Sequence, residues 1–323
     1  MLTIGNLTLD VPFYQAPLSG YTDRAMRLLA RRFGCPLTFT GVVLDKSALH
    51  ERTIDKAHLR PVPEEHPVGV QVLGSDPGTM ARAAQMFEHV GFDVIDLNFA
   101  CPAPKVLRRG RGGALLTDPD AVVAIIRAVR RAVSVPVMVK LRIGADETDG
   151  LDNFRRICEL ASAEGVAAVG VHGRSVCKLF RGRADWAVIC ETKSRFPGLT
   201  VVGSGDLMTP QVVVERIRTS GADGVMIARG AIGNPWIFTE VRELLQGRPL
   251  PPPPSLAEQA KVMLEHFEMV LTLRDETKAV RYFRKFAAGY CKRHPERIKA
   301  QLAIMAARTA QQVRDAIRHW HGL

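Results

Sequence analysis

An amide, a thiol and an ammonium group follow one another within eight residues at the end of one apolar segment. The segment is VIDLN at 94–98, and the three groups belong to Asn98, Cys101 and Lys105. An apolar run that ends in a proline-containing turn is typical of a buried strand. A solitary cysteine in such a place is more often a core-packing residue than a catalytic one. A catalytic site here therefore requires further functional groups from elsewhere in the chain.

Polar residues also end several other apolar segments. Gln71 lies in one of them, Lys140 and Arg142 end another, and His172 and Arg174 end a third. A single polar residue in an apolar strand is unremarkable, but six strands that each end in a hydrogen-bonding residue indicate a shared site. The remaining examples are Ser19 and Thr22, Ser204 and Asp206, and Arg229.

Eight apolar segments alternate with helical patterns over the first 245 residues. Strands are predicted at 13–17, 37–41, 68–74, 94–98, 137–142, 168–173, 200–205 and 224–228. Helices with apolar residues three to four positions apart are predicted between most of them, for example at 25–33, 77–91, 118–133 and 210–221. Ahead of the first strand, a hairpin is predicted with arms at 2–3 and 8–9 and a turn at Gly5-Asn6.

These segments predict an α/β fold, a (β/α)8 TIM barrel. Strands that are apolar almost throughout are buried on both faces, which favours a parallel sheet, and eight strand-helix units match the barrel. A doubly wound sheet is the second possibility. It would carry a glycine-rich fingerprint after its first strand, and APLSGYTD at 16–23 is not one.

In a TIM barrel the functional groups gather at the carboxyl ends of the strands. Glycines at 203, 205, 230 and 233 follow the last two strands, where backbone N–H groups and helix starts form the usual phosphate site of this fold. Arg229 would add a charged donor. The sequence therefore predicts a ligand that carries a phosphate.

The other polar groups narrow the chemistry of that ligand. Lys140 is cationic, His172 can change its charge, and Gln71 offers both a donor and an acceptor, without paired carboxylates or a metal-ligand cluster beside them. A phosphate-anchored cofactor whose reduced ring is stabilised by a nearby cation fits this set better than hydrolysis does, and FMN meets that description. The alternative interpretation is a core histidine and an ion-paired interior lysine.

The alternation of strand and helix patterns ends at residues 246–255, QGRPLPPPPS. Four consecutive prolines there favour a stiff linker. We expect a barrel domain at 1–245, this linker, and a small all-helical domain at 256–323. Residues 255–323 carry 13 Lys/Arg and 7 Asp/Glu, a net +6, whereas the other 254 residues have 31 against 26, a net +5. Basic residues, including Arg284 and Lys285, are interleaved there with aromatic ones, which suits a ribose-phosphate surface, although the aromatic residues could equally form a core face.

The overall composition is that of a globular protein with a polyanionic partner. The formal charge is +11, and such an excess usually indicates nucleic acid. No apolar run reaches about 18 residues and the N-terminus lacks the pattern of a signal peptide, so we expect a soluble cytoplasmic protein. The six cysteines, at 35, 101, 158, 177, 190 and 291, are scattered singly, which indicates neither a zinc site nor a disulfide framework.

With these motifs in order, the chain resembles the tRNA-dihydrouridine synthases, most closely the bacterial members of that family. The resemblance covers nearly the whole chain. Its motifs are APLSGYTDRAMR at 16–27, GVQVLGSDP at 69–77, DLNFACPAPKV at 96–106, GGALL at 112–116, VPVMVKLRIG at 135–144, VHGR at 171–174, SGDL at 204–207, ARGAIGNPWIF at 228–238 and RKFAAGYCKRHP at 284–295. Phe286 stands where the commonest family pattern has a histidine, which leaves the tRNA contacts and the modified position open.

The resemblance implies a role for each predicted site residue. Cys101 would be the catalytic acid. FMN would be bound by Pro17, Leu18, Ser19, Gln71, Lys140 and His172, with its phosphate end held by Ser204, Gly205, Asp206, Ala228 and Arg229. The tRNA would be bound by Asn98, Lys105, Arg142, Arg174, Arg284 and Lys285.

The implied reaction reduces the C5=C6 bond of particular uridines in tRNA. NADPH or NADH would reduce FMN, the flavin would deliver hydride to C6, and Cys101 would protonate C5 on the opposite face. An ordinary thiol titrates near pH 8.5, so it is mostly protonated at neutral pH and still acidic enough to donate. The target base must leave its stack, which is easiest where the RNA is already loosely structured. We expect neither a metal nor an obligate protein partner, and a monomer.

Two other functions stay open at this point. A flavin barrel that reduces or oxidises a free pyrimidine, like dihydroorotate or dihydropyrimidine dehydrogenase, would act on small molecules and would not need residues 255–323. A non-catalytic tRNA-binding protein would bind tRNA equally well after Cys101→Ala.

Overall fold

The computed structural model describes residues 1–50, 53, 56–146 and 150–322. Its centre is a parallel sheet of eight strands in the spatial order β3-β10-β9-β8-β7-β6-β5-β4. The two outer strands of that order meet where the backbone N–H of Gln15 donates to the carbonyl of Leu37 at 3.1 Å. The strands are β3 (Phe13–Gln15), β4 (Thr38–Leu44), β5 (Val68–Leu73), β6 (Val94–Asn98), β7 (Val137–Arg142), β8 (Ala168–His172), β9 (Val201–Ser204) and β10 (Gly224–Ile227).

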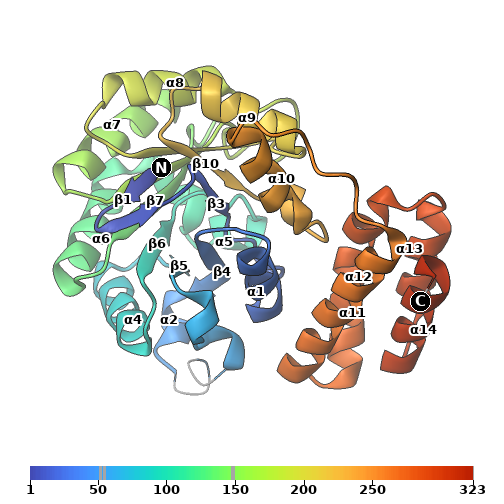
Figure 1. Cartoon of the computed structure of the whole chain (residues 1–323). Coiled ribbons are helices and arrows are strands. Elements are labelled where there is room, and N and C mark those ends of the chain that lie inside the picture. Colours follow the sequence, from blue (N-terminus) through green and yellow to red (C-terminus); the bar gives the residue numbers. More distant parts are fainter. Residues whose placement is uncertain (51–52, 54–55, 147–149, 323) are drawn as a thin grey trace.

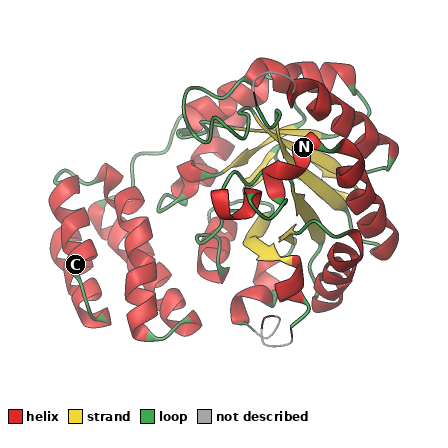
Figure 2. Cartoon of the chain, turned by 180° about the vertical axis from the view of Figure 1, so that it is seen from behind, coloured by secondary structure: helices red, strands yellow, loops and turns green. Residues whose placement is uncertain are grey.

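Helices enclose this sheet on its outside, as Figures 1 and 2 show. They are α1 (Arg24–Arg32), α2 (Asp45–Ala48), α4 (Pro77–Val90), α5 (Pro104–Leu107), α6 (Pro119–Ala132), α7 (Gly150–Ala163), α8 (Trp186–Arg195), α9 (Pro210–Thr219) and α10 (Trp236–Leu245), with 3-10 turns η1 (Ala57–Leu59), η2 (Pro63–Glu65), η3 (Gly112–Thr117) and η4 (Arg229–Ala231). The predicted TIM barrel is therefore confirmed, and the doubly wound alternative was wrong because such a sheet stays open.

Three barrel helices begin with the same local signal, a capping side chain followed by proline. Asp76, Asp118 and Thr209 each accept a hydrogen bond from a backbone N–H in the first turn, and a proline stands at the next position. Proline costs nothing at the start of a helix, since the N–H that it lacks would have no partner there. The sequence therefore fixes where α4, α6 and α9 begin.

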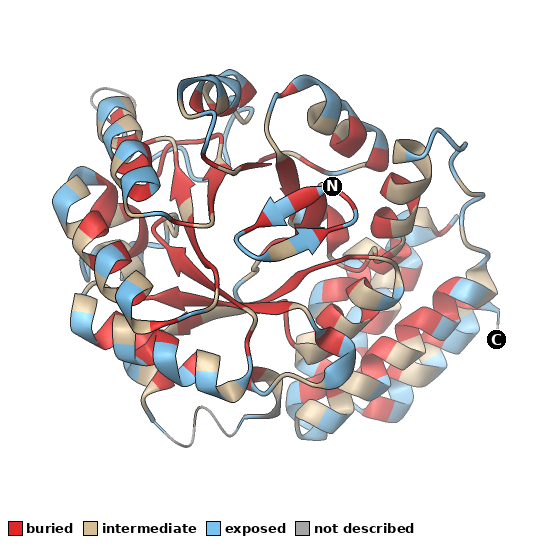
Figure 3. Ribbon diagram, turned by 60° about the vertical axis from the view of Figure 1, so that its left-hand side comes forward, coloured by how far each residue is buried: buried red, intermediate tan, exposed pale blue. Residues whose placement is uncertain are grey.

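The interior of the barrel and the layer between strands and helices are separate apolar clusters. Tyr14, Phe39, Met138 and Met226 belong to the interior cluster, together with residues of the hairpin β1 (Leu2–Ile4) and β2 (Leu7–Leu9). That hairpin pairs Leu2 with Leu9 as predicted. Its apolar side chains therefore fill one end of the barrel, and Figure 3 shows the buried strands behind it.

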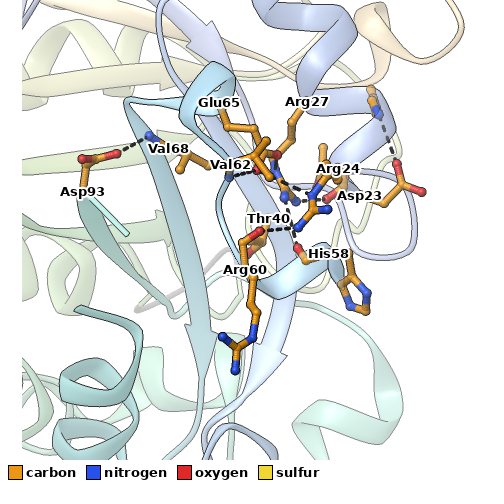
Figure 4. Close-up of polar contacts among 12 residues, drawn as sticks. Asp23, Arg24, Arg27, Thr40, His58, Arg60, Val62, Glu65, Val68 and Asp93 are labelled. Atoms are coloured by element: carbon orange, nitrogen blue, oxygen red, sulfur yellow. Dashed lines mark hydrogen bonds and ion pairs between the residues drawn. The ribbon is translucent and has the colours of Figure 1, made fainter. Parts of the chain in front are cut away.

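A buried ion pair ties the β4–β5 connection to α1. Arg27 donates from Nε to Glu65 Oε1 at 2.8 Å and from Nη2 to the carbonyl of His58 at 3.0 Å. The second carboxylate oxygen of Glu65 accepts from the backbone of Val62 at 3.0 Å (Figure 4). Because both charged side chains are fully buried, loss of either partner would leave an uncompensated charge in the core.

Residues beyond the barrel form four helices and a short turn. They are α11 (Leu256–Leu273), α12 (Glu276–Tyr290), η5 (Cys291–Arg293), α13 (Arg297–Ala306) and α14 (Ala310–His321). A segment without helix or strand leads from α10 to α11 and contains the four prolines (Figure 1). The C-terminal region is therefore all helical, as predicted.

The helices of this C-terminal region also contact the barrel. Arg274 pairs with Asp23 at 2.7 Å, and Arg293 pairs with Glu240 at 2.6 Å. In both pairs the carboxylate is the more buried partner, with 3% and 9% of its side chain exposed. The two pairs join the helical region to α1 and α10.

The largest difference between predicted and observed strands concerns β4. It was predicted to end at Gly41 but continues to Leu44, with a shift of register against β5 between Phe39 and Val42. Glycine usually marks a strand end, but a glycine at a bulge lets the strand continue after an irregular step. Boundaries elsewhere differ by a few residues, such as β3, which ends at Gln15.

Candidate active site at the carboxyl ends of the barrel strands

A pocket of about 450 Å³ opens at the carboxyl ends of the strands, a size typical of small-molecule and cofactor sites. Every strand of the barrel, or the loop after it, contributes to its lining. The predicted site residues that line it are Pro17, Leu18, Ser19, Gln71, Asn98, Cys101, Lys140, Arg142, His172, Ser204, Gly205, Asp206, Ala228 and Arg229.

Alternation along the strands directs these side chains into the pocket. In β7, Val137, Val139 and Leu141 pack against the surrounding helices. Met138 packs in the barrel interior, and Lys140 and Arg142 line the pocket above it. Successive side chains of a strand point to opposite faces. A run such as VMVKLR therefore builds the core and the site at once.

The loop that carries Cys101 is held through its backbone. The side-chain oxygen of Asn98 accepts from the N–H groups of Ala100 and Cys101 at 3.0 and 2.9 Å. The carbonyl of Cys101 accepts from the Gly113 N–H at 3.0 Å, and Arg142 Nε donates to the carbonyl of Ala100, also at 3.0 Å. The thiol is thus positioned without using its own sulfur atom.

A chain of side-chain hydrogen bonds leads from that loop into the barrel. Asn98 Nδ2 donates to Gln71 Oε1 at 2.7 Å, and Gln71 Nε2 donates to Asp96 Oδ2 at 2.6 Å. All three side chains are buried. The sequence interpretation did not include Asp96 in the site, although its place two residues before Asn98 on the same strand puts both on one face.

The site is electrostatically positive, and burial has the largest effect on its ionisable groups. Burial, followed by the positive charge of Lys140 and of three arginines, lowers the pKa of His172 to about 2, so its ring is neutral at neutral pH. Burial also lowers the pKa of Lys140 and raises that of Asp96, although each charge partly offsets the shift of the other. Within the described part of the chain, His172 Nε2 is buried and has no hydrogen-bond partner. A ligand could supply that missing partner.

An acidic residue organises the end of the pocket predicted to bind phosphate. Asp206 pairs with Arg174 at 2.7 Å and with Arg229 at 3.3 Å, and accepts from the Ala184 N–H at 2.9 Å. A Cβ on Gly205 would lie 2.4 Å from the Cβ of Ala184, and its φ is +136°. Only glycine fits there, because the φ is positive and Ala184 occupies the space of a Cβ.

Four predicted site residues lie outside this lining. Arg174 is buried and directed to Asp206, so its position suits orienting that carboxylate. Lys105 is exposed on α5. Arg284 bonds the carbonyl of Ala307 at 2.5 Å, and Lys285, which is exposed, bonds the carbonyl of Gly20 at 3.1 Å.

The aromatic residues of the basic segment belong mainly to the core. Phe283 and Tyr290 are almost fully buried, with 0% and 1% of their surface exposed. Tyr282 is half-buried and donates from its hydroxyl to the Tyr21 carbonyl at 2.7 Å. The core-face interpretation of these aromatics is therefore the correct one for Phe283 and Tyr290.

Two aromatic residues that the sequence interpretation missed line the pocket, Tyr21 and Phe180. Phe180 is 58% exposed, and its ring lies 5.5 Å from the guanidinium carbon of Arg142 and 5.2 Å from that of Arg229. An exposed ring between two cations is suited to stacking on another planar group. No periodicity marked Phe180, because it lies in a long loop after β8.

In the described ranges, no three His, Cys, Asp or Glu side chains gather closely enough to hold a metal ion. None of the helices that the structure describes has the length and apolar character needed to cross a membrane.

Known protein families and sequences resemble the chain over nearly all its length. The family described as dihydrouridine synthase (Dus) matches residues 14–319. A probable tRNA-dihydrouridine synthase of Rickettsia conorii is 33% identical over 99% of this chain and 96% of its own length. The tRNA-dihydrouridine synthase B of Xanthomonas campestris pv. campestris is 34% identical (96% and 92%), and that of Pseudomonas aeruginosa 35% (90% and 86%).

Two solved structures share the fold at low sequence identity. Histamine dehydrogenase from Rhizobium sp. 4-9 aligns with a TM-score of 0.60 at 15% identity and covers 82% of this chain. The 2-naphthoyl-CoA reductase complex aligns with a TM-score of 0.61 at 13% identity and covers 77%. This chain spans only about half the length of either, 50% and 52%.

Proposed function

Because the chain belongs to the dihydrouridine synthase family, we propose that it is a tRNA-dihydrouridine synthase, an oxidoreductase that reduces the C5=C6 bond of particular uridines in tRNA. The observation that carries the proposal is that the Cys101 thiol lines the same pocket as the side chains of Lys140 and His172. Its relatives that bear this name support the substrate class.

FMN is the cofactor that we propose, with NADPH or NADH as reductant. The residues present fit such a group: the pocket is mostly apolar and large enough, His172 Nε2 lacks a partner among the described residues, and Gly205 is part of the pocket lining. When bound and reduced, a flavin supplies a hydride. Pro17, Leu18, Ser19, Gln71, Lys140 and His172 would hold its ring end, and Ser204, Gly205, Asp206, Ala228 and Arg229 its phosphate end.

Within this pocket each side chain has a task that its position suits. Cys101 donates a proton to C5 of the uracil, since its thiol lies on the pocket wall on a loop with a fixed backbone. Lys140 is a cation that stabilises negative charge on a bound ring. His172, neutral because of its burial, serves as a hydrogen-bonding partner rather than as a charge.

Substrate binding extends beyond the pocket. We propose that Asn98 and Arg142 border the target base and that Lys105 and Lys285, both exposed, approach phosphates of the tRNA. Arg174 and Arg284 would act through the protein groups that they bond. In this proposal residues 1–245 form the catalytic domain, 246–255 the linker and 256–323 the tRNA-binding domain of a cytoplasmic monomer.

Mapping dihydrouridine by mass spectrometry, in tRNA from cells with and without the gene, tests this function. We expect one or more positions to lose the modification when the gene is absent, and the purified protein to be yellow. Cys101→Ala should keep its flavin and lose about 100-fold or more of its turnover, the contribution of a positioned acid. Cys190→Ala, an exposed cysteine on α8, is the matched control and should keep full activity.

The alternatives predict other results. Turnover of free pyrimidines without tRNA would support the small-molecule flavoenzyme. A colourless protein that refuses FMN on reconstitution would remove the cofactor claim. Unchanged dihydrouridine at every position, with no second gene for the same site, would leave a tRNA-binding protein.

A further inference from the structure

Asp96 lies next to the proposed site but is not part of its lining. It is on β6 with only 4% of its surface exposed, and its Oδ2 accepts from Gln71 Nε2 at 2.6 Å. Gln71 therefore directs its NH₂ group toward Asp96, whose carboxyl oxygen serves as the acceptor.

That orientation fixes the next amide along the chain of hydrogen bonds. With its NH₂ group toward Asp96, Gln71 presents Oε1 to Asn98, which donates from Nδ2 at 2.7 Å. Asn98 then presents its own oxygen to the backbone N–H groups of Ala100 and Cys101. The backbone N–H groups can only donate, so they demand this orientation of both amides, and the acceptor oxygen of Asp96 satisfies it at the other end.

The orientation of the two amides also determines whether the pocket wall presents hydrogen-bond donors or acceptors to a ligand. An amide NH₂ has two hydrogens, and the chain uses one from Gln71 and one from Asn98. Both side chains line the pocket, where the ammonium of Lys140 adds further donors. The wall therefore offers N–H donors, which match the carbonyl oxygens of a flavin or uracil ring.

We infer that Asp96 is a positioning residue that sets the orientation of Gln71 and Asn98, and through them both the loop of Cys101 and the donor character of the pocket wall. The link to catalysis rests on the proposed function. Without Asp96, one N–H of Gln71 would be buried without an acceptor, and either amide could then turn over.

The effect on the loop is measurable in the cofactor-free protein, whatever its activity. We compare the rate at which iodoacetamide alkylates Cys101, followed by mass spectrometry of its peptide, in the wild type, Asp96→Leu and Asp96→Asn. Asp96→Leu removes the acceptor and should change that rate about threefold or more. Asp96→Asn keeps an acceptor oxygen and should stay within about twofold of the wild type.

Exchanging the amide of Gln71 with the carboxylate of Asp96 tests the orientation itself. It also covers the case in which Asp96→Leu does not fold. Gln71→Glu alone sets two carboxylates against each other and should disturb Cys101 alkylation. The double variant Gln71→Glu/Asp96→Asn exchanges the donor and the acceptor between the two positions, and residue 71 still accepts from Asn98. Its alkylation rate should therefore return to within about twofold of the wild type.

Flavin binding and turnover give the remaining readouts. For Asp96→Leu we expect a dissociation constant for FMN about tenfold higher, a shifted visible flavin spectrum, and tRNA-dependent flavin reoxidation about 10- to 100-fold slower. Asp223→Leu is the matched control, because it removes the same kind of acceptor carboxyl, one that accepts from the backbone N–H of Val201 at 2.8 Å, at the opposite end of the barrel. It should lower stability without these changes.

Two results would overturn the inference: an Asp96→Leu protein with the Cys101 alkylation rate and FMN affinity of the wild type, or an exchanged pair no closer to the wild type than Gln71→Glu alone. A wild-type protein that binds no flavin and leaves tRNA unmodified would instead overturn the proposed function, and the alkylation rates would still decide the role of Asp96.

Discussion

At the scale of single residues, the proposed catalytic residue of the site is distinct from the side chains that hold its loop in place. Cys101 is positioned by hydrogen bonds to its backbone, so a change of its side chain leaves the loop intact. Arg142 holds two loops at once, through the carbonyls of Ala100 and Leu179 at 3.0 and 2.7 Å. Its guanidinium therefore has a structural task whether or not it also meets the substrate.

His172 should make the stability of the cofactor-free protein depend on pH. Its folded pKa of about 2 lies below the ordinary value of 6.5, so between these values the unfolded chain binds more protons and stability is lost as the pH falls. Relative to His172→Gln, the wild type should lose up to about 1.4 kcal/mol of unfolding free energy per pH unit below about pH 6. Urea unfolding at pH 6.5, 5.5 and 4.5 measures this difference.

The matched control for this experiment is His89→Gln, which changes an exposed histidine at the outer surface of α4. Its curve over the same pH range gives the baseline for losing an exposed histidine. Parallel stability curves for the wild type and His172→Gln would contradict the neutral, buried imidazole.

At the scale of elements, the helical region supports the loop between β3 and α1. Arg274 pairs with Asp23, the hydroxyl of Tyr282 donates to the carbonyl of Tyr21, and Lys285 donates to that of Gly20. The same loop contributes Pro17, Leu18 and Ser19 to the pocket. The docking of α12 and the shape of the pocket are therefore coupled through this loop.

Close packing of α12 against the loop after β10 predicts that Gly289→Ala weakens this docking. A Cβ at Gly289 would lie 1.9 Å from the carbonyl oxygen of Ile232, which lines the pocket. Overpacking of this kind costs about 1–3 kcal/mol. We expect lower stability in urea and faster protease cleavage within 246–255.

Gly198→Ala is the control for that substitution, since nothing lies within 4 Å of a Cβ added there. Its stability should stay near that of the wild type, with cleavage of the linker unchanged. If Gly289→Ala behaved in the same way, the close approach of α12 to Ile232 would not hold the two regions together.

At the scale of the whole molecule, positive charge is spread over both regions but is denser in the helical one. Residues 255–323 carry a net +6 within 69 residues, and the other 254 residues carry +5. Several of the arginines there are paired with carboxylates, such as Arg293 with Glu240 and Arg314 with Glu268. The paired arginines are less available to a polyanion, although the net charge of the chain already counts their carboxylates.

We expect tRNA binding to weaken with salt in proportion to the phosphates contacted. The logarithm of the binding constant falls with the logarithm of the salt concentration, with a slope of about −0.7 to −0.9 for each phosphate contacted. A protein that contacts two phosphates therefore binds about tenfold more weakly at 200 mM than at 50 mM salt. Lys105→Gln should make the slope shallower by about one unit. Filter binding over a salt series measures it.

Arg127→Gln serves as the control, because Arg127 pairs with Glu164 on the outer wall of the barrel at 2.6 Å. Its salt slope should equal that of the wild type. An unchanged slope for Lys105→Gln would remove Lys105 from the contact surface.

The sequence by itself determined the barrel, its eight strands and most of the pocket lining. Strand alternation and the fold rule that sites lie at the carboxyl ends of strands are local or general properties, so Lys140, His172 and Arg229 could be assigned to one site from their positions in the chain. Capping signals fixed several helix starts for the same reason.

Only the tertiary structure decided which polar groups face a ligand and which face one another. Asp206 and Arg174 looked alike in sequence as strand-end residues, yet their side chains pair with each other. Asp96 looked like an interruption of a core strand and proved to bond Gln71 across to β5. Such pairings join residues 25 to 32 positions apart, and hydrogen-bond partners at that separation depend on strand register, which no local pattern encodes.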